Sequence, residues 1–278
     1  MVAPQGQFVW YELMTTDVEA AKAFYAKVMG WDTRDASMPG MAYTLFTIGG
    51  DRVGGVMNLP DDARRMGAEP RWIGYVGVDD VDAAADRITR IGGSLQVPPT
   101  DIPNVSRFAI FADPQTAMLG ALKWSGPHHW QAADISARGR VGWHELVAKD
   151  QEKAFAFYAD IFGWQKGEAD VGAPGTYQLF SAGEITIGGM LTMPSTMQFP
   201  FWRYYFNTDD IDAAAKRVTA GGGLIVDGPL ELPVGTGIVQ CSDPQGAAFA
   251  LEGRRRPRPP GYFARAVPRE GPDTSGKR

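Results

Sequence analysis

The sequence predicts an α+β protein of two similar tandem domains, each built from two βαβββ units. One observation behind this prediction is a long internal repeat, and another is a strand-helix-strands pattern that occurs twice in each half. The length of 278 residues is the third, because it is enough for two domains with separate cores. An apolar fraction of 44% with 34 glycines is typical of a folded protein with many turns.

The first half of the chain recurs in the second half. Residues 10–13, Trp-Tyr-Glu-Leu, return 133 residues later as residues 143–146, Trp-His-Glu-Leu. An offset of 134 then relates Tyr43 to Tyr177, and an offset of 130 relates the late Asp-Pro-Gln turns. The offset changes where one surface loop is shorter, and loops tolerate such changes. The scaffold is therefore duplicated.

Each half again contains one pattern twice. A strand from Val9 to Thr15 is rich in β-formers, and Thr16 to Glu19 forms a Thr-x-x-Glu capping box before the helical run AAKAFYAKVMG. Short strands follow at YTLFTIGG and RVGGVMNLP, and the cycle restarts with the strand RWIGYVGV and the helix DVDAAADRITRIGG. The βαβββ unit thus occurs four times.

The repeat sets the expected domain boundaries. Domain 1 covers residues 7–125, a linker covers 126–139, and domain 2 covers 140–253. Residues 254–278 form a Pro/Arg-rich tail, which we interpret as solvated, with contact to an anionic partner as the alternative.

Composition excludes several partners. A net charge of −5 argues against nucleic acid, because binding to phosphates needs clustered Lys and Arg. The single cysteine, Cys241, excludes an internal disulfide. The N-terminus lacks a signal-peptide pattern, and no apolar stretch approaches the roughly 20 residues that span a bilayer. We expect a cytoplasmic protein without a membrane partner.

Paired βαβββ units with a strand-Asp-helix-Phe-Tyr-Gly-Trp opening and a late Asp-Pro-Gln turn resemble the vicinal oxygen chelate superfamily. This superfamily includes glyoxalase I, bleomycin-resistance proteins, fosfomycin-resistance enzymes and extradiol dioxygenases. The resemblance covers roughly residues 7–253 and is greatest to bacterial tandem proteins of the hydroxylase-like or glyoxalase family. It implies that two units form a curved mixed sheet around a cavity, where His, Gln or Glu side chains hold a metal.

The resemblance also places the metal ligands on the first strand of each unit and seven residues after the Asp of the Asp-Pro turn. The corresponding residues are Trp10, Ile73 and Gly120 in domain 1 and Trp143, Arg203 and Ala250 in domain 2. These side chains do not coordinate divalent cations, and a guanidinium repels them. We therefore expect no cofactor, with a divalent metal at other residues as the alternative.

Two glutamates are the candidate catalytic residues. Side chains alternate faces along a strand, so Glu12 shares a face with Trp10, and Glu145 with Trp143. Burial disfavours the charged form of a carboxylate, which suits a general base, an amine-binding anion or a lone metal ligand. The alternative is structural, with each Glu accepting hydrogen bonds from neighbouring strands or from an Arg.

The candidate ligand-binding residues lie on the same strands and on the first strand of the second unit in each half. They are Trp10, Ile73, Tyr75, Trp143, Arg203 and Tyr205. Trp72 and Trp202 fall on the opposite face, unless the register slips by one residue.

Several other residues are interpreted as structural or as surface residues. We expect His144 to be a core histidine that faces the helix, and Cys241 to be a buried apolar residue. The two Phe-Tyr pairs at residues 24–25 and 157–158 pack onto the sheet, and His128 and His129 lie on the surface.

The leading hypothesis is a protein that binds a small aromatic or amphipathic molecule in two metal-free cavities, with Glu12 and Glu145 as polar anchors. A metal-dependent lyase, isomerase or dioxygenase with unusual ligands, such as either Glu with Glu252, is the alternative. A third reading is an interaction module whose tail binds a partner. The sequence leaves open whether the protein is an enzyme, whether it is a monomer or a homodimer, and whether the units pair within or between halves.

Overall fold

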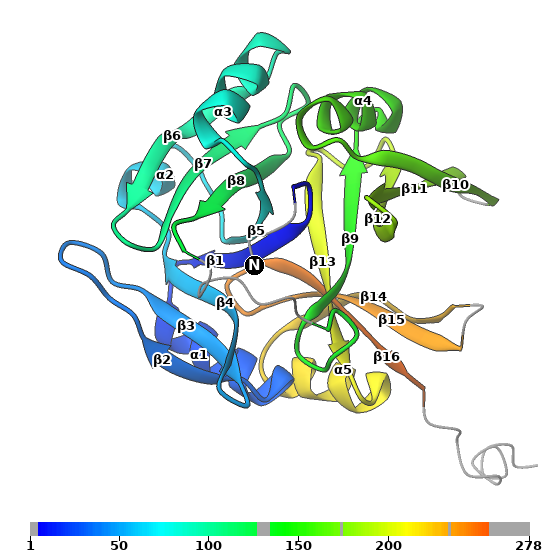
Figure 1. Ribbon diagram of the computed structural model, residues 1–278. Coiled ribbons are helices and arrows are strands. Elements are labelled where there is room, and N and C mark those ends of the chain that lie inside the picture. Colours follow the sequence, from blue (N-terminus) through cyan, green and yellow to red (C-terminus); the bar gives the residue numbers. More distant parts are fainter. Residues whose placement is uncertain (1–4, 127–133, 173–174, 233–234, 256–278) are drawn as a thin grey trace, which may run out of the picture.

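The computed structural model describes residues 5–126, 134–172, 175–232 and 235–255. Each half of the chain forms one eight-stranded mixed sheet, so the predicted α+β class with two tandem domains is confirmed (Figure 1). The expected linker falls partly outside the described residues, as do His128, His129 and the tail beyond residue 255.

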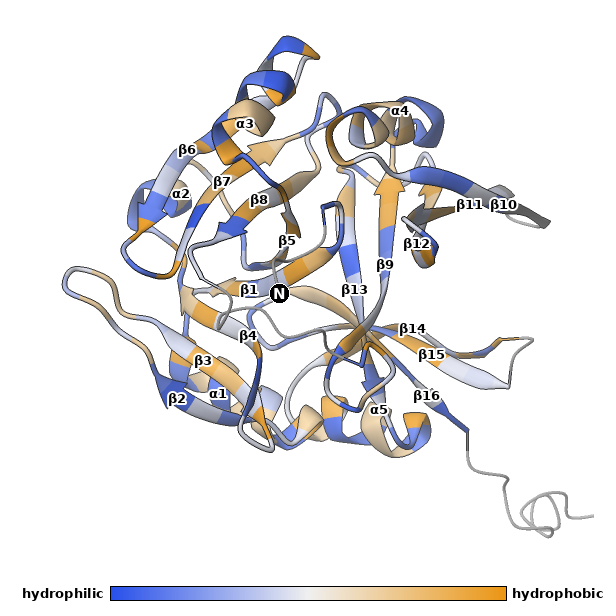
Figure 2. Cartoon of the chain, viewed as in Figure 1, coloured by the Kyte–Doolittle hydropathy of each residue, from blue (hydrophilic) through white to orange (hydrophobic). Residues whose placement is uncertain are grey.

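The sheet of domain 1 has the strand order β2-β3-β4-β1-β5-β8-β7-β6. Its strands are β1 (Phe8–Thr15), β2 (Asp32–Asp35), β3 (Thr44–Ile48), β4 (Asp51–Asn58), β5 (Arg71–Gly77), β6 (Ser94–Ile102), β7 (Ser106–Ala112) and β8 (Met118–Trp124). The helices are α1 (Val18–Met29), α2 (Asp61–Arg65) and α3 (Val81–Arg90). Strands β7 and β8 are mainly apolar, whereas α3 is amphipathic (Figure 2).

The sheet of domain 2 repeats this order as β10-β11-β12-β9-β13-β16-β15-β14. Its strands are β9 (Val141–Ala148), β10 (Gln165–Gly172), β11 (Gly175–Ala182), β12 (Ile185–Thr192), β13 (Phe201–Thr208), β14 (Leu224–Glu231), β15 (Thr236–Ser242) and β16 (Ala248–Arg254). The helices are α4 (Gln151–Phe162) and α5 (Ile211–Ala220). In both sheets the first strands of the two units pair antiparallel, β1 with β5 and β9 with β13, so the units pair within each half.

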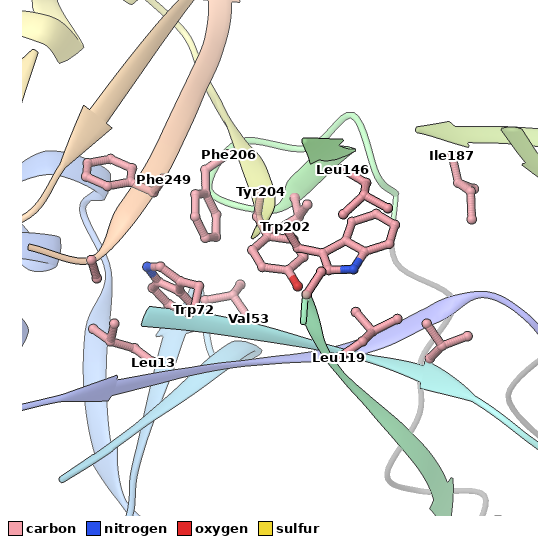
Figure 3. Close-up of a cluster of buried hydrophobic side chains, with 14 of the residues drawn as sticks. Leu13, Val53, Trp72, Leu119, Leu146, Ile187, Trp202, Tyr204, Phe206 and Phe249 are labelled. Atoms are coloured by element: carbon pink, nitrogen blue, oxygen red, sulfur yellow. The ribbon is translucent and has the colours of Figure 1, made fainter. Parts of the chain in front are cut away.

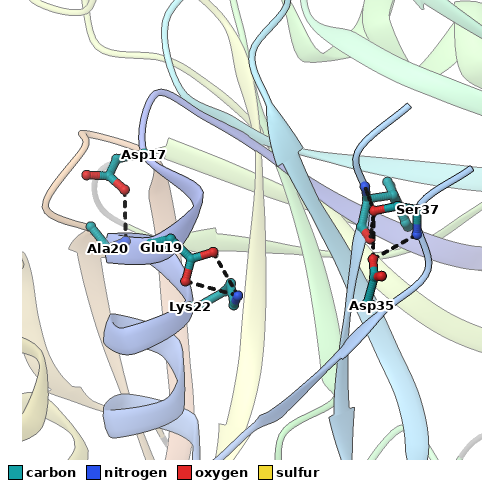
Figure 4. Close-up of polar contacts among 7 residues, drawn as sticks. Asp17, Glu19, Ala20, Lys22, Asp35 and Ser37 are labelled. Atoms are coloured by element: carbon teal, nitrogen blue, oxygen red, sulfur yellow. Dashed lines mark hydrogen bonds and ion pairs between the residues drawn. The ribbon is translucent and has the colours of Figure 1, made fainter. Parts of the chain in front are cut away.

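Helix α1 begins one residue later than the capping box predicts. The side chain of Asp17, and not that of Thr16, accepts a hydrogen bond from the Ala20 backbone N–H at 2.9 Å, while Glu19 binds Lys22 (Figure 4). An aspartate caps α3, α4 and α5 in the same way. An N-cap of this kind contributes about 1 kcal/mol, which explains why this aspartate recurs in all four units.

The helix-covered faces of the two sheets are packed against each other. Helix α1 contacts α5, and α3 contacts α4, so one helix of each domain lies on either side of the central strands β5 and β13 (Figure 1). Between them Trp72, Trp202, Tyr204 and Phe206 form a continuous buried core (Figure 3). The predicted strand register therefore holds, because Trp72 and Trp202 lie on the opposite face of their sheets from Ile73 and Arg203.

The repeated Phe-Tyr and Asp-Pro-Gln motifs join the two domains. The Tyr25 hydroxyl donates to Asp243 at 3.2 Å, and the Tyr158 hydroxyl donates to Asp113 at 3.0 Å. Each aspartate also accepts backbone N–H groups of its own turn. The tyrosines were expected to be core residues, and the structure adds that each reaches the other domain.

No helix among the described residues is both long and apolar enough to cross a membrane.

Candidate functional site

The face of each sheet that points away from the other domain carries the residues selected from the sequence. We call these faces the domain 1 cup and the domain 2 cup. In the domain 1 cup, Trp10 and Glu12 come from β1, and Ile73 and Tyr75 come from the neighbouring strand β5. Strand alternation sends Leu13 and its neighbours on the other face into the interdomain core.

Glu12 is buried at the floor of the domain 1 cup, with 9% of its surface exposed. It accepts a hydrogen bond from the Tyr75 hydroxyl at 3.1 Å and another from the Tyr43 hydroxyl of the segment that leads into β3. Tyr43 in turn accepts the indole N–H of Trp10 at 3.0 Å. Among the described residues, the donors to this carboxylate are therefore neutral.

Burial sets the ionisation of this group. Desolvation raises the pKa of Glu12, and the hydrogen bonds from Tyr43 and Tyr75 only partly oppose it. Desolvation and the charge of Glu12 raise the pKa of both tyrosines well above the ordinary value. Both hydroxyls therefore stay protonated and act as donors, while Glu12 is a carboxylate with a raised affinity for a proton.

The remainder of the domain 1 cup is apolar. Ile73, Ile110 and Leu122 are buried around the acid, and Phe108 and Trp124 pack over them with part of their surface exposed. Trp10 and Trp124 meet edge to face with ring centroids 5.8 Å apart. The cup thus offers aromatic surface next to one acid.

The domain 2 cup repeats this arrangement with one important change. Glu145, 6% exposed, accepts the Tyr205 hydroxyl at 3.0 Å and also pairs with the Arg203 guanidinium at 2.9 Å. Trp143 donates its indole N–H to Tyr177 at 2.8 Å. Desolvation raises the pKa of Glu145, but here the positive charge of Arg203 opposes the rise.

Three apolar positions of the domain 1 cup are polar in the domain 2 cup. Ile73, Ile110 and Leu122 are replaced by Arg203, Gln240 and Glu252 at the same register positions of the sheet. Glu252 accepts a hydrogen bond from the Thr236 hydroxyl at 3.2 Å and lies on a different strand from Glu145. The duplicated scaffold therefore carries two chemically different cups.

The positions that hold metal in the resembled superfamily do not suit a metal here. A Cβ atom at Gly120 would lie 2.1 Å from the Tyr75 ring, so this tyrosine occupies the space of the usual glutamate. Within the described ranges there is also no group of three or more His, Cys, Asp or Glu side chains that could hold an ion. The Tyr75 ring therefore fills the space of one family ligand, and the residues at these positions do not fit a metal.

Two residues expected to be structural are indeed buried, but His144 faces the other domain and not a helix. Its Nδ1–H donates to the Ile187 carbonyl at 2.5 Å, and its Nε2 accepts the Tyr11 hydroxyl at 2.6 Å. Desolvation lowers the pKa of His144 to about 3, so the ring is neutral. Burial raises the pKa of Cys241 to about 12, which makes its thiol unreactive.

Tyr43 and Tyr177, which contact the indoles of the two cups, were not predicted as site residues. Two features of the sequence could have indicated them: the two tyrosines match at the offset of 134, and a glycine lies on the neighbouring strand in each half. A Cβ atom at Gly55 would lie 2.0 Å from the Tyr43 hydroxyl, and one at Gly189 would lie 2.2 Å from the Tyr177 ring. The glycines let each tyrosine lie across the sheet and reach the cup.

A surface pocket of 380 Å³ lies at the N-terminal end of α1 and shares Tyr43 with the cup. Its lining includes Asp17, Glu19 and Ser37, and none of Glu12, Tyr75 or Phe108. Because loop and helix-start residues form most of it, we place the candidate site at the cup.

Comparison with known proteins identifies the family. The model of the Glyoxalase/Bleomycin resistance protein/Dioxygenase superfamily matches residues 7–119 and 140–251, and the chain belongs to this superfamily. The chain is 33% identical to the putative glyoxylase CFP32 of Mycobacterium bovis over 249 residues, which are 89% of this chain and 94% of that protein. It is 30% identical to the anthracycline biosynthesis protein DnrV of Streptomyces peucetius over 259 residues, 88% of this chain and 92% of that protein.

A solved structure with the same fold corrects one expectation. The Mn(II)-bound glyoxalase of Novosphingobium aromaticivorans superposes with a TM-score of 0.61 at 15% identity, covering 92% of this chain and 84% of that one. Because a protein with this fold binds Mn(II), the expectation of no cofactor, which rested on missing family ligands, is wrong. A metal is compatible with the fold, although the described residues at those positions do not supply its ligands.

Proposed function

We propose that the domain 1 cup binds a small, hydroxylated aromatic molecule and that Glu12 accepts the hydrogen bond of its hydroxyl group. One observation carries the proposal: a buried carboxylate, with no ion pair to any described residue, lies beneath partly exposed aromatic side chains. Within the part of the chain that the structure describes, Glu12 has neutral hydroxyls as its partners, and a carboxylate has room for about four hydrogen bonds. A ligand hydroxyl would donate a further hydrogen bond to Glu12, and such a bond to a charged group is stronger in a desolvated site than in water.

The lining supports an aromatic ligand. Trp10, Phe108 and Trp124 retain exposed surface around the acid, and aromatic rings recognise other rings by stacked or edge-to-face contact. A relative of this chain is named as a protein of anthracycline biosynthesis, and anthracyclines are hydroxylated aromatic molecules. This agreement supports the ligand class without naming the ligand.

The charge distribution favours the domain 1 cup over the domain 2 cup. In domain 2 the guanidinium of Arg203 already neutralises Glu145, so an incoming hydroxyl gains less from the acid. Gln240 and Glu252 also replace apolar residues there, which reduces the apolar area open to a ring. We therefore assign the binding of the aromatic ligand to domain 1.

Calorimetric titration with 2-naphthol and with its methyl ether tests the proposal. The ether keeps the rings but cannot donate, so it should bind at least tenfold more weakly, in line with about 1.5–3 kcal/mol for a hydrogen bond to a charged group. Glu12→Gln should weaken 2-naphthol at least tenfold and leave the ether unchanged.

The repeat offers the matched control. Glu145→Gln, measured below its melting transition, should change 2-naphthol binding less than twofold. Tyr75→Phe and Tyr205→Phe form a second pair, of which only the first should alter binding. Failure of the wild type to bind 2-naphthol, or equal losses in Glu12→Gln and Glu145→Gln, would refute the proposal.

A further inference from the structure

Arg71 stands out at the edge of the domain 1 cup. It is the first residue of β5 and lies opposite Met14 of β1. Because Trp72 enters the interdomain core, alternation puts Arg71 on the same face as Ile73 and Tyr75. Its Nη1 donates to the sulfur of Met118, a residue that packs on the apolar cluster of the cup.

The guanidinium of Arg71 is half-buried and weakly partnered. Its Nε donates to the Glu69 carbonyl at 3.0 Å, and its Nη1 lies 3.2 Å from the Met118 sulfur, which is a weak acceptor. Desolvation lowers the pKa of Arg71, and the charge of Glu69 opposes this only in part, without an ion pair between them among the described contacts. Several N–H donors of the planar fork therefore have no strong acceptor among the residues that the structure describes.

The corresponding strand of domain 2 places its arginine differently. There Phe201 takes the position of Arg71, and Arg203, two residues further along, reaches the floor and pairs with Glu145. The first cup thus has its positive charge at the rim and an unpaired acid at the floor. The second cup has both charges joined at the floor.

We propose that the ligand of the domain 1 cup carries an acidic group, a carboxylate or an ionised phenol, and that Arg71 binds this group at the rim. The inference rests on the proposed function and gives the ligand a second polar group, at the end away from its hydroxyl. Glu12 pairs with Ile73 on the neighbouring strand, and Arg71 lies two residues before Ile73, about 7 Å along β5. This spacing fits an aromatic acid with its hydroxyl at one end and its acidic group at the other.

The planar guanidinium is suited to this role. It can hold a carboxylate through two parallel N–H···O bonds, which a lysine cannot reproduce. Partial burial strengthens the attraction relative to a fully hydrated arginine. The aromatic side chains between the two polar ends would contact the rings of the ligand.

The test compares 6-hydroxy-2-naphthoate with 2-naphthol on the full chain. The wild type should bind the hydroxy acid at least tenfold more tightly, because it satisfies both ends. Arg71→Met should remove this advantage and change 2-naphthol binding less than twofold, and Arg71→Lys should restore only part of it. Arg90→Met, on the outer helix α3, is the control and should change neither affinity.

The outcomes separate this inference from the proposed function. If 2-naphthol binds and depends on Glu12 while the hydroxy acid gains nothing, or if Arg71→Met weakens both probes equally, the inference is wrong and the proposed function stands. If 2-naphthol does not bind the wild type, both fail together.

Discussion

The two cups share one backbone and differ in where their charges lie. Each has a Trp-x-Glu strand, an indole that donates to a tyrosine, and a second tyrosine that donates to the acid. In domain 2 the acid is also neutralised by Arg203, whereas in domain 1 the corresponding residue is Ile73. Duplication has thus kept the acid and changed its electrostatic surroundings. The difference shows that a repeated residue need not have a repeated role.

The largest expected effect is on the ion pair of domain 2. Arg203→Met should lower the free energy of unfolding at pH 8 by about 3–5 kcal/mol, because it leaves Glu145 buried without its cation. Urea denaturation measures this change. Protonation of Glu145 relieves the problem, so the loss should shrink as the pH falls toward the ordinary glutamate pKa of about 4.3.

An exposed ion pair supplies the control for that experiment. Arg87→Met removes the partner of Asp160 on the surface and should cost about 0–1 kcal/mol. Equal losses in the two variants would mean that the Arg203 pair is no more important than a solvated one.

The next effect concerns Gly120. A methyl group there would lie 2.1 Å from the Tyr75 ring, so Gly120→Ala should displace the ring and cost about 1–3 kcal/mol. The hydrogen bond to Glu12 should be lost with it, and 2-naphthol binding should weaken. Domain 2 already has Ala250 at this position, so Ala250→Gly should cost only about 0.5–1 kcal/mol through backbone entropy. A well-tolerated Gly120→Ala variant with normal binding would contradict this geometry.

A smaller effect is expected at the tyrosines that contact the indoles. Tyr43→Phe removes a donor to Glu12 and should cost about 1 kcal/mol or somewhat more. Tyr177→Phe should cost less, because Glu145 keeps both Arg203 and Tyr205. Thermal melting of the two variants compares the cups directly, and a larger loss in Tyr177→Phe would reverse the ranking.

The pH dependence of Glu12→Gln is the most subtle prediction. Since burial raises the folded-state pKa of Glu12, this residue contributes stability below its unfolded pKa and loses it as the pH rises through the folded value. The glutamine variant does not titrate. Its stability relative to the wild type should therefore rise with pH from about 4.3 upward. A difference that is flat with pH would show that Glu12 is not desolvated.

The fold was predictable because its information is repeated along the chain. Four aspartates start four helices, and strand alternation alone separates Trp72 from Ile73. The packing of the domains was not predictable, because it depends on contacts between distant segments such as Tyr25 with Asp243. The same limit applies to His144. Its face of the sheet was predicted correctly, but its contacts across the interdomain interface were not.

The candidate site was only partly predictable, for a related reason. Alternation placed Glu12, Tyr75, Glu145 and Tyr205 on the cup faces, and spacing alone could show neither their hydrogen bonds nor the pairing of Arg203 with its acid. Tyr43 reaches Glu12 from beyond the strand that carries the acid, through space left by Gly55. Arg71 was missed because its proposed role depends on its having no ion pair among the described contacts, which a sequence does not show.

The most direct test of the account follows the indole N–H signals in ¹H–¹⁵N spectra while 2-naphthol is added. The signals of Trp10 and Trp143, assigned with the Trp10→Phe and Trp143→Phe variants, report separately on the two cups. The account predicts a saturable shift of the Trp10 signal, with Trp143 unchanged over the same range. A shift of Trp143 alone, or of both with one affinity, would contradict the claim that the domain 1 cup is the binding site.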